Sequence, residues 1–427
     1  MDTIFALATT PGKSGIAVVR VSGPRAFDCV ERLCGFRPKG RGMRLSSIRN
    51  GSDVLDEGLI LSFPAPGSFT GDSVVEFQTH GSVAVVNELL RVLGSIQGVR
   101  HAEPGEFTRR ALENGKLDLT QVEGLADLID SETEAQRRQA QRTFSGALGQ
   151  KVEVWRKKLV RAAALIEATI DFADEDVPED VTPEVLGLLL EVQKSLSIEA
   201  AGVAMSERIR GGFEVAIVGP PNIGKSTLLN TLAARDAAIT SEVAGTTRDV
   251  IEVRMDLQGL PVTLLDTAGV RETDDLVESM GVERAKERAA AADLRVFLIE
   301  PDGSPVFPPM DEDLIFVGKA DCYDGDFPAV SGATGLGIST LSNQIAEILS
   351  SRIGDGGTAT RYRHEAAMRE ASGFIEDARG LLSGCSDQLD VAAFLLRTAI
   401  AELEGLVGRI DVEDLLDEIF ASFCLGK

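Results

Sequence analysis

The amino-acid sequence predicts a multidomain fold, mixed α/β and α, in which an α/β domain is inserted into a helical domain. Three kinds of pattern lead to this prediction. Residues 1–117 combine short β-rich runs with Gly- and Pro-rich turns, residues 118–210 are helical in spacing, and residues 211–352 alternate short apolar strands with helices. Residues 353–427 return to the helical pattern. A helical segment on each side of an α/β unit indicates one domain split in sequence by another.

The expected elements follow from these patterns in chain order. The runs GIAVVRVSG and DSVVEFQTHG are β-rich, and residues 83–96 have helical spacing. The acidic stretch DFADEDVPEDVTPE interrupts the first helical segment and is expected to be a loop between two helices. The apolar runs EVAIV, VTLLD, LRVFLIE, DLIFVG and PAV predict the strands of a parallel sheet covered on both faces. Little room remains between LRVFLIE and DLIFVG for a connecting helix.

Composition narrows the class of protein. No apolar run approaches the ~18–20 residues that a membrane-spanning helix needs. The first residues lack the basic and apolar regions of a secretory signal. Five cysteines, an odd and scattered number, do not suggest a disulfide framework. We therefore expect a cytoplasmic protein with no membrane contact.

The net charge of −24 argues against broad contact with nucleic acid, because Lys and Arg supply most of the affinity for phosphate backbones. Any contact with RNA must use a local patch or the surface of a partner. The densest basic stretch has apolar residues between its cations at helical spacing, so a solvated helix face is favoured over an RNA site. Its members are Arg137, Arg138, Arg142, Lys151, Arg156, Lys157, Lys158 and Arg161.

A nucleotide site is indicated by Gly219–Ser226, which fits the pattern G-x-x-x-x-G-K-[ST] between a predicted strand and a predicted helix. Backbone N–H groups in such a loop bind phosphate, the lysine reaches the β- and γ-phosphates, and the Ser226 hydroxyl binds Mg²⁺. A plain Gly-rich turn is the disfavoured alternative. The residues expected at the nucleotide are Asn222, Ile223, Gly224, Lys225, Ser226 and Thr227.

Two further stretches follow in the order that a GTPase requires. Gly245–Asp249 offers threonines that can close on Mg²⁺ and the γ-phosphate. Asp266, Thr267, Ala268 and Gly269 end a predicted strand, which places Asp266 near the metal and the Gly269 N–H near the γ-phosphate. Val270 stands where many GTPases carry the glutamine that orients the attacking water. Hydrolysis is therefore either very slow or carried by another residue and a cation.

The base-reading loop departs from the usual pattern. Guanine is normally read by N-K-x-D after a strand, with the aspartate accepting hydrogen bonds from the base. Here the loop is Gly318-Lys319-Ala320-Asp321, so the lysine and aspartate remain and the asparagine is missing. Ser331, Gly332 and Ala333 would supply the contact to the guanine oxygen. GTP remains the favoured nucleotide, and the alternative is a degenerate nucleotide-binding module.

From end to end, the chain resembles the MnmE (TrmE) family of tRNA modification GTPases. The stretches that carry the resemblance are TTPGKSGIAVVRVSGP, APGSFTGDSVVEFQTHG, PGEFTRRALENGKLDLTQVEGLADLID, GTTRDV, DTAGVRETDDLVE and FCLGK. It implies a tetrahydrofolate-binding dimerisation domain over residues 1–117, similar to folate-binding aminomethyltransferases. It also implies a discontinuous helical domain over 118–210 and 353–427, closed by C-x-G-K, and an inserted Ras-like P-loop GTPase domain over 211–352.

The resemblance implies a function as well. Family members are similar in acting as homodimers with a FAD-dependent partner, MnmG (GidA), in a heterotetramer or larger complex. They add a carboxymethylaminomethyl or aminomethyl group to C5 of uridine 34 of certain tRNAs. The implied cofactors are GTP, Mg²⁺, K⁺ and 5-formyl- or methylene-tetrahydrofolate. Arg20, Glu76, Lys116 and Lys427 would contact the folate, whose carboxylates suit the cations.

Residue roles in hydrolysis are also implied by the resemblance. K⁺ would take the place of an arginine finger, held by Asn222, Ser241, Val243 and Thr246, while Ser226 and Thr247 hold Mg²⁺. Glu278 would orient the attacking water. The loop expected to cover the nucleotide comprises Ser241, Glu242, Val243, Ala244, Gly245, Thr246 and Thr247.

Cys424 allows more than one interpretation. Gly426 and Lys427 fit a prenylation signal badly. A buried filler is the ordinary role of a free cysteine, whereas the resemblance implies a thiol at the folate site that takes part in modification. A rival function for the whole chain is a GTPase switch in the assembly of ribosomes or other RNA complexes, without modification chemistry. The folate-domain stretches and C-x-G-K argue against it.

Overall fold

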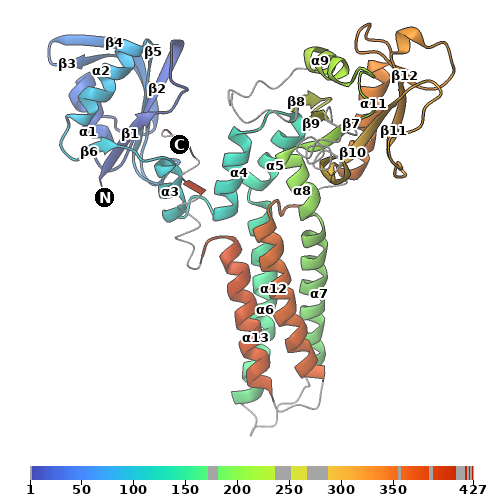
Figure 1. The fold of residues 1–427 in the computed structure, drawn as a ribbon. Coiled ribbons are helices and arrows are strands. Elements are labelled where there is room, and N and C mark those ends of the chain that lie inside the picture. The colour runs from blue at the N-terminus through green and yellow to red at the C-terminus, as the bar shows by residue number, and fades with distance from the viewer. Residues whose placement is uncertain are drawn as a thin grey trace, which may run out of the picture. The chain divides into compact units, whose positions relative to one another are not determined.

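The computed structural model describes residues 2–171, 181–235, 252–266, 287–353, 357–383, 388–409, 419–420, 423 and 426. The chain forms two compact units, whose elements are labelled in Figure 1. The first unit comprises Met1–Ala126 and Glu404–Lys427, and the second comprises Asp127–Leu403. The end of the chain therefore belongs to the same unit as its beginning. The four segments expected from the sequence stay a prediction.

The first unit is built on a six-stranded sheet with strand order β3-β4-β5-β2-β1-β6. Its strands are β1 (Thr3–Leu7), β2 (Ser14–Ser22), β3 (Gly42–Asn50), β4 (Asp53–Phe63), β5 (Val74–Gly81) and β6 (Val99–His101). β1 and β6 run parallel, and the other neighbours are antiparallel. The runs predicted to be β-rich are confirmed as β2 and β5, which pair directly and place Arg20 opposite Glu76.

Two helices cover one face of this sheet, and a third packs on the opposite face. α1 (Ala26–Cys34) and α2 (Val83–Gly94) bury Leu33 and Leu89 against strand residues such as Val19 and Phe77. The predicted helix near residues 83–96 is thus confirmed. α3 (Glu106–Glu113) follows β6 and buries Phe107 against β1.

The end of the chain packs on this unit. Phe420 and Phe423 pack with Val122, which lies on α4 (Leu119–Ile129). Gly426 lies against β1, where a Cβ would stand 2.2 Å from the carbonyl oxygen of Leu7. Only glycine fits such an approach.

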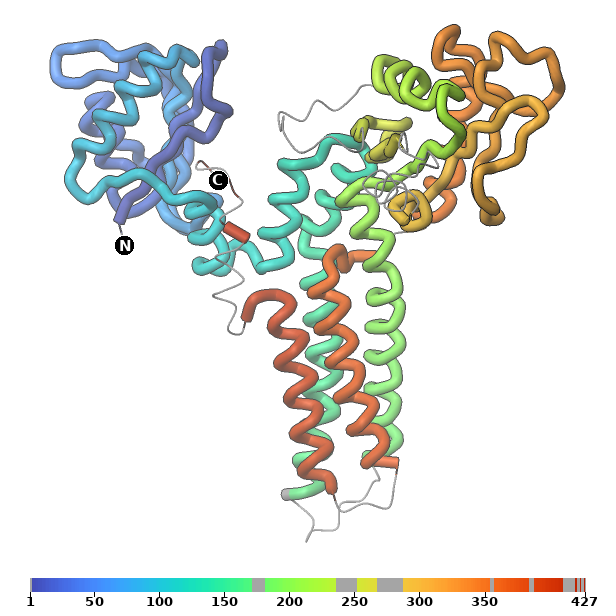
Figure 2. Tube along the Cα trace, viewed as in Figure 1, coloured from blue at the N-terminus to red at the C-terminus, as the bar shows by residue number. Residues whose placement is uncertain are grey.

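The second unit contains a bundle of long helices, traced in Figure 2. The long helices are α6 (Ala147–Asp171), α7 (Thr182–Ala201), α12 (Tyr362–Ser383) and α13 (Leu389–Leu406), and the shorter α5 (Glu134–Phe144) and α8 (Val203–Gly211) adjoin them. α6 and α7 flank the predicted loop, residues 171–184. Residues 172–180 lie outside the described residues, and 182–184 form the first turn of α7, so the prediction of a loop is wrong at those positions. Among the described helices, none is long and apolar enough to cross a membrane.

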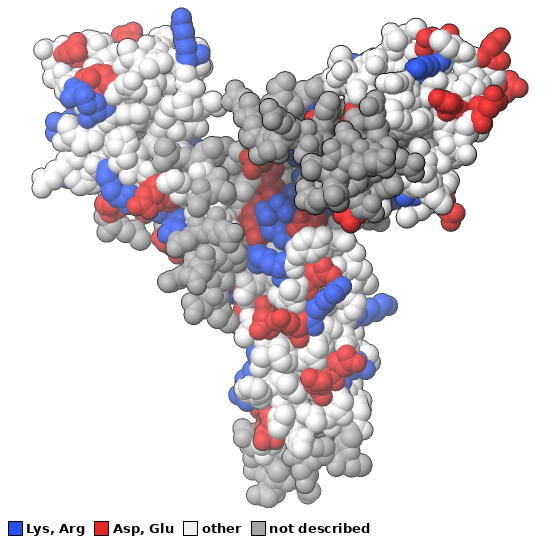
Figure 3. Space-filling view, in the orientation of Figure 1, with Lys and Arg blue, Asp and Glu red and all other residues white. Residues whose placement is uncertain are grey.

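The basic stretch on α5 and α6 pairs with acids. Arg137 and Arg138 bond Glu134 on their own helix, while Lys158 and Arg161 reach Glu191 and Glu184 of α7. Figure 3 shows Lys and Arg mixed with Asp and Glu on the visible face of the helical bundle. This supports the solvated helix face expected for the basic stretch.

A second six-stranded sheet lies in the second unit, with order β12-β11-β10-β7-β9-β8. Its strands are β7 (Phe213–Val218), β8 (Glu252–Leu257), β9 (Leu260–Asp266), β10 (Leu294–Ile299), β11 (Leu314–Gly318) and β12 (Ala329–Val330). α9 (Lys225–Arg235) and α11 (Ile338–Ile353) pack on it. All five predicted strands are confirmed. No helix lies between β10 and β11, as the short connection predicts.

Within this sheet, β8 is the strand that the sequence pattern does not predict, and it makes the sheet mixed. It pairs antiparallel with β9, so the expectation of a parallel sheet is wrong at this edge. The cause is a two-residue hairpin at Gln258 and Gly259, whose φ values of 54° and 89° suit the turns that join antiparallel strands.

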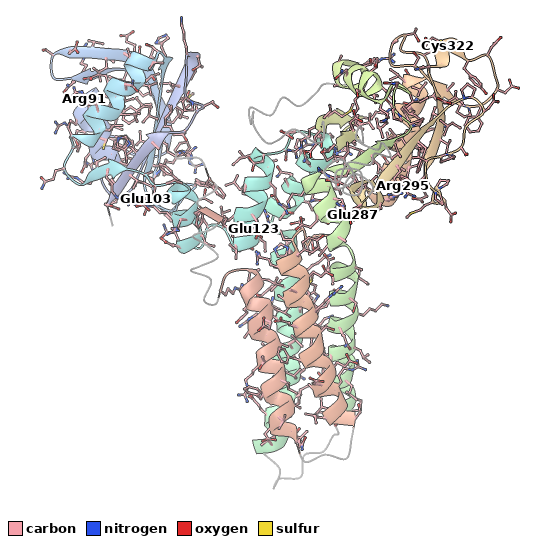
Figure 4. The ribbon with its side chains drawn as sticks, in the orientation of Figure 1. Arg91, Glu103, Glu123, Glu287, Arg295 and Cys322 are labelled. Carbon is pink, nitrogen blue, oxygen red and sulfur yellow. The ribbon has the colours of Figure 1, made fainter. Side chains whose placement is uncertain are left out.

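An ion pair is buried at the start of β10. Arg295 and Asp313 have only 5% and 6% of their side-chain surface exposed, and Nε and Oδ1 are 3.0 Å apart. The guanidinium also lies over the rings of Phe297 and Phe307. Figure 4 labels Arg295 on its strand. The pair therefore fixes the segment before β11 to the sheet.

We expect Asp313→Ala to destabilise the protein by about 3–5 kcal/mol, because a buried guanidinium is left without its partner. Urea unfolding checks this, with Glu191→Ala as the control. Glu191 belongs to the exposed pair with Lys158, whose side chains are 64% and 35% exposed, and its loss should cost no more than about 1 kcal/mol. Equal effects of the two substitutions would contradict the role of the buried pair.

Candidate functional site

The phosphate-binding loop connects β7 to α9. Gly219 follows the last residue of β7, and Lys225 is the first residue of α9. Asn222 and Gly224 have positive φ values of 61° and 107°, which asparagine and glycine tolerate best. The loop therefore ends in the helix N-terminus that a bound phosphate requires.

Lys225 is folded back across its own loop. Its Nζ donates to the carbonyl oxygens of Gly219 at 2.8 Å and Pro220 at 3.0 Å. The side chain is buried, which lowers its pKa, and the neighbouring Asp266 opposes that effect. The ammonium is thus held at the loop in a position from which it can turn to an anion.

Ser226 and Asp266 form the second cluster of the site. The Ser226 hydroxyl donates to Oδ2 of Asp266 at 2.7 Å. Asp266 is 1% exposed, and its Oδ1 has no hydrogen-bond partner among the described residues. A hydroxyl and a buried carboxylate with a free oxygen are the donors that Mg²⁺ prefers.

A cavity of about 260 Å³ lies beside the loop, and it gathers the predicted base-reading residues. Predicted residues that line it are Asn222, Ile223, Gly224, Thr227, Lys319, Asp321, Ser331, Gly332 and Ala333. Leu228, Leu298 and Val330 also line it and are not predicted. Leu298 and Val330 lie on strands, so their positions follow from the sheet order and could have been inferred from it.

The base loop is fixed in a definite conformation. Lys319 has a left-handed φ of 55°, and Asp321 is the middle residue of the short 3-10 helix Ala320–Cys322 that follows it. A hydrogen bond from the side chain of Ser331 lowers the pKa of the Asp321 carboxyl, which is ionised at neutral pH and can accept hydrogen bonds. Cys322, labelled in Figure 4, is exposed beside it.

Gly332 holds the third loop against α9. A Cβ at this position would stand 2.5 Å from the backbone nitrogen of Leu228, and the Gly332 carbonyl accepts from Thr231 at 2.7 Å. The absence of a side chain is therefore required for the loop to reach the cavity.

The remaining predicted residues of this site lie outside the described part of the chain. They are Ser241, Glu242, Val243, Ala244, Gly245, Thr246, Thr247, Thr267, Ala268, Gly269 and Glu278. Their roles stay predictions.

In the first unit, two of the predicted folate residues meet. Arg20 Nη2 and Glu76 Oε1 are 2.9 Å apart on paired strands, and Arg20 Nη1 donates to the Gly426 carbonyl at 3.4 Å. The guanidinium also lies over the ring of Phe107, 5.7 Å from its centroid, a contact that is not predicted. These contacts bring the end of the chain to Arg20.

The other predicted folate residues are less closely defined. Lys116 lies beside Gly71: a Cβ added to Gly71 would stand 3.2 Å from Cε of Lys116. Lys427 and Cys424 lie outside the described residues.

A larger cavity, of about 600 Å³, lies in the second unit and contains none of the predicted residues. Several charged residues that line it are already paired. Asp127 bonds Arg361 at 2.8 Å, and Glu132 bonds Arg254 at 3.5 Å. We assign it no chemistry.

A phosphate-binding loop, a buried carboxylate bonded to its serine and a base loop at one edge of a mostly parallel sheet define a P-loop nucleotide-binding domain of the GTPase type. Comparison with known proteins extends this class. The family model described as the MnmE helical domain matches residues 119–424, and that described as the GTP-binding protein TrmE N-terminus matches residues 3–116. The chain therefore belongs to the MnmE family of tRNA modification GTPases.

Relatives named tRNA modification GTPase MnmE match along the full length of both chains. Those of Ruegeria pomeroyi, Roseobacter denitrificans and Paracoccus denitrificans are 59%, 58% and 47% identical to it. Among solved structures, Aquifex aeolicus Era bound to GDP and AlF4⁻ is 25% identical over 38% of this chain and 66% of that chain, with a TM-score of 0.26. The G domain of Thermotoga maritima FeoB is 20% identical over 32% and 97%, with a TM-score of 0.24.

We expect Asp321→Asn to shift nucleotide preference from guanine toward xanthine. The carboxylate is expected to accept from the ring N1 and the exocyclic amine of guanine, whereas an amide can donate to the carbonyl that xanthine has in place of that amine. Binding constants for GDP and XDP check this, with the exposed Asp324→Asn as the control. An unchanged preference for GDP would mean that guanine is read elsewhere.

Proposed function

We propose that this GTPase acts in the cytoplasm and hydrolyses GTP in a K⁺-dependent manner. With a FAD-dependent partner of the MnmG (GidA) type, it adds a carboxymethylaminomethyl or aminomethyl group to C5 of uridine 34 of certain tRNAs. Membership of the family supports the reaction class. The observation that carries the proposal is the contact of Arg20 with both Glu76 and Gly426, since it joins the end of the chain to a charged cluster far from the nucleotide loop in sequence. A pure assembly switch has no need of such a contact.

The described side chains have definite tasks in GTP binding. Lys225 would exchange its two carbonyl partners for the β- and γ-phosphate oxygens, so its charge stays satisfied before and after binding. Ser226, with Thr247, would hold Mg²⁺, which supplies charge neutralisation at the phosphates. Asp266, which accepts a hydrogen bond from Ser226, would orient the ligands of the Mg²⁺ site.

A K⁺ site and one acidic residue are proposed for the hydrolytic step itself. The Asn222 side chain lies in a loop that lines the base cavity, and it offers an amide oxygen of the kind that a hard monovalent cation prefers. Ser241, Val243 and Thr246 would complete the K⁺ site. Glu278 would position the attacking water without neutralising charge.

The first unit is proposed to bind 5-formyl- or methylene-tetrahydrofolate and to form a homodimer. Arg20, Lys116 and Lys427 would meet the carboxylates of the folate, and Glu76 would hydrogen-bond its ring. Support for dimerisation comes from β3, the edge strand of the sheet, where Met43 and Leu45 are 75% and 71% exposed. An apolar sheet edge is a common place for a second copy to bind.

We expect GTP hydrolysis to be fast in KCl and to fall to its basal rate in NaCl at equal ionic strength, because K⁺ replaces a charge worth about 10³–10⁵ in kcat in other GTPases. Asn222→Gly should abolish the difference between the salts. Glycine keeps the left-handed φ of 61° accessible at this position, so the loop is retained. Equal turnover of the natural chain in both salts would contradict the K⁺ site.

We expect Arg20→Ala to weaken binding of 5-formyltetrahydrofolate by roughly 10–150-fold, the loss for one hydrogen bond to a charged group. Isothermal titration calorimetry measures this. Arg91→Ala is the matched control, because Arg91 is an exposed arginine of the same unit that pairs with Glu88 on its own helix; Figure 4 labels it. Unchanged binding by Arg20→Ala would place the folate elsewhere.

Cys424 is proposed to act in modification and not in hydrolysis. We expect Cys424→Ser to keep the full rate of GTP hydrolysis and to lose tRNA modification, since serine retains the size but not the reactivity of the thiol. Assays of the two activities on the same preparation measure both. Retained modification would return Cys424 to the role of a filler.

A further inference from the structure

The missing asparagine of the base loop has a structural counterpart in the phosphate-binding loop. A Cβ built on Gly318 would stand 2.7 Å from Cγ1, 2.9 Å from the carbonyl oxygen and 3.0 Å from Cδ1 of Ile223. Carbon atoms in proteins do not approach so closely without strain. The two loops are therefore closer together than any side chain at position 318 allows.

Ile223 fills the space between them. It is 5% exposed and belongs to the same core cluster as Leu298, Phe316 and Val330. It also lines the base cavity, whereas Gly318 is not among the residues that do. The apolar side chain thus occupies the place from which a residue at position 318 would reach the cavity.

Gly318 itself is fixed by the sheet. It is the last residue of β11, and it pairs in register with Val330 of β12. Because the strand end cannot move without disturbing this pairing, relief of a clash would have to come from the phosphate-binding loop. One of the three close atoms there is a backbone oxygen, which moves only with the loop.

We propose that Ile223 and Gly318 are a size-matched pair that sets the position of the base loop and thereby the affinity for the guanine nucleotide. The base loop is held against the phosphate-binding loop by the packing of Ile223, and Asp321 is the side chain of residues 318–321 that hydrogen-bonds the base. The inference rests on the guanine-nucleotide binding proposed above. On this proposal, the glycine at position 318 is matched by the size of Ile223 and does not indicate a degenerate nucleotide site.

The experiment is a double-mutant cycle on the full chain, with fluorescent GDP as the probe. Gly318→Asn in the natural chain should weaken GDP binding at least about tenfold, as overpacking does. Ile223→Ala removes the two close carbon atoms and keeps the backbone oxygen, so in that background Gly318→Asn should cost at least about threefold less than it does in the natural chain. Gly318→Ala adds the Cβ alone. It should likewise weaken GDP binding more in the natural chain than in the Ile223→Ala background.

Gly211→Ala is the control, because a Cβ there meets no atom within 4 Å and should leave binding unchanged. Thermal unfolding of every variant reports the packing independently, and the same non-additivity is expected in Tm. The proposed pair would be contradicted if the Gly318→Asn variant bound GDP as tightly as the natural chain. It would also be contradicted if Gly318→Asn weakened GDP binding by the same factor with and without Ile223→Ala. If the natural chain bound no GDP, the proposed function would be contradicted. If the effects of Gly318→Asn and Ile223→Ala on Tm were simply additive, the packing of Ile223 against Gly318 would be contradicted.

Discussion

The pairing of β7 between β9 and β10 is the constraint on which the nucleotide site depends. All three strands run parallel, so their carboxyl ends lie at one edge of the sheet. Ile217 pairs with Asp266, and Val218 pairs with Phe297. The register therefore sets the buried carboxylate beside the start of the phosphate-binding loop. Leu298, next in β10, reaches the base cavity for the same reason.

Within this frame the polar groups of the site satisfy one another. Lys225 bonds backbone carbonyls and Ser226 bonds Asp266, so neither buried charge is left isolated. Binding of a nucleotide and a metal would exchange these hydrogen bonds for new ones and need not create an unpaired charge. The free oxygen of Asp266 would gain a partner outright on metal binding.

Much of this could be predicted from sequence, because the deciding signals are local. Apolar runs bounded by turns predict the strands, and Gly219–Ser226 predicts its loop without reference to distant residues. β8 escapes prediction because its hairpin turn, Gln258-Gly259, is not among the common turn pairs. The proximity of Ile223 to Gly318 escapes it as well. The two lie 95 positions apart, and only the sheet order brings them together.

The first unit shows where residue patterns alone do not suffice. Arg20 and Glu76 look like ordinary surface charges in sequence, and their pairing needs the register of β2 with β5. The position of Gly426 beside Arg20 depends on the end of the chain returning to its beginning. The resemblance to a family supplied these residues, whereas Phe107 had no such signal and required the structure.

The central claim, that this GTPase serves modification of the tRNA wobble position, is tested most directly by nucleoside analysis. Total tRNA from a strain lacking the protein is digested and its nucleosides are separated by chromatography and mass. The account predicts loss of carboxymethylaminomethyl- and aminomethyl-type uridines, with recovery when the natural chain is restored. A nucleoside profile unchanged by the deletion would contradict it.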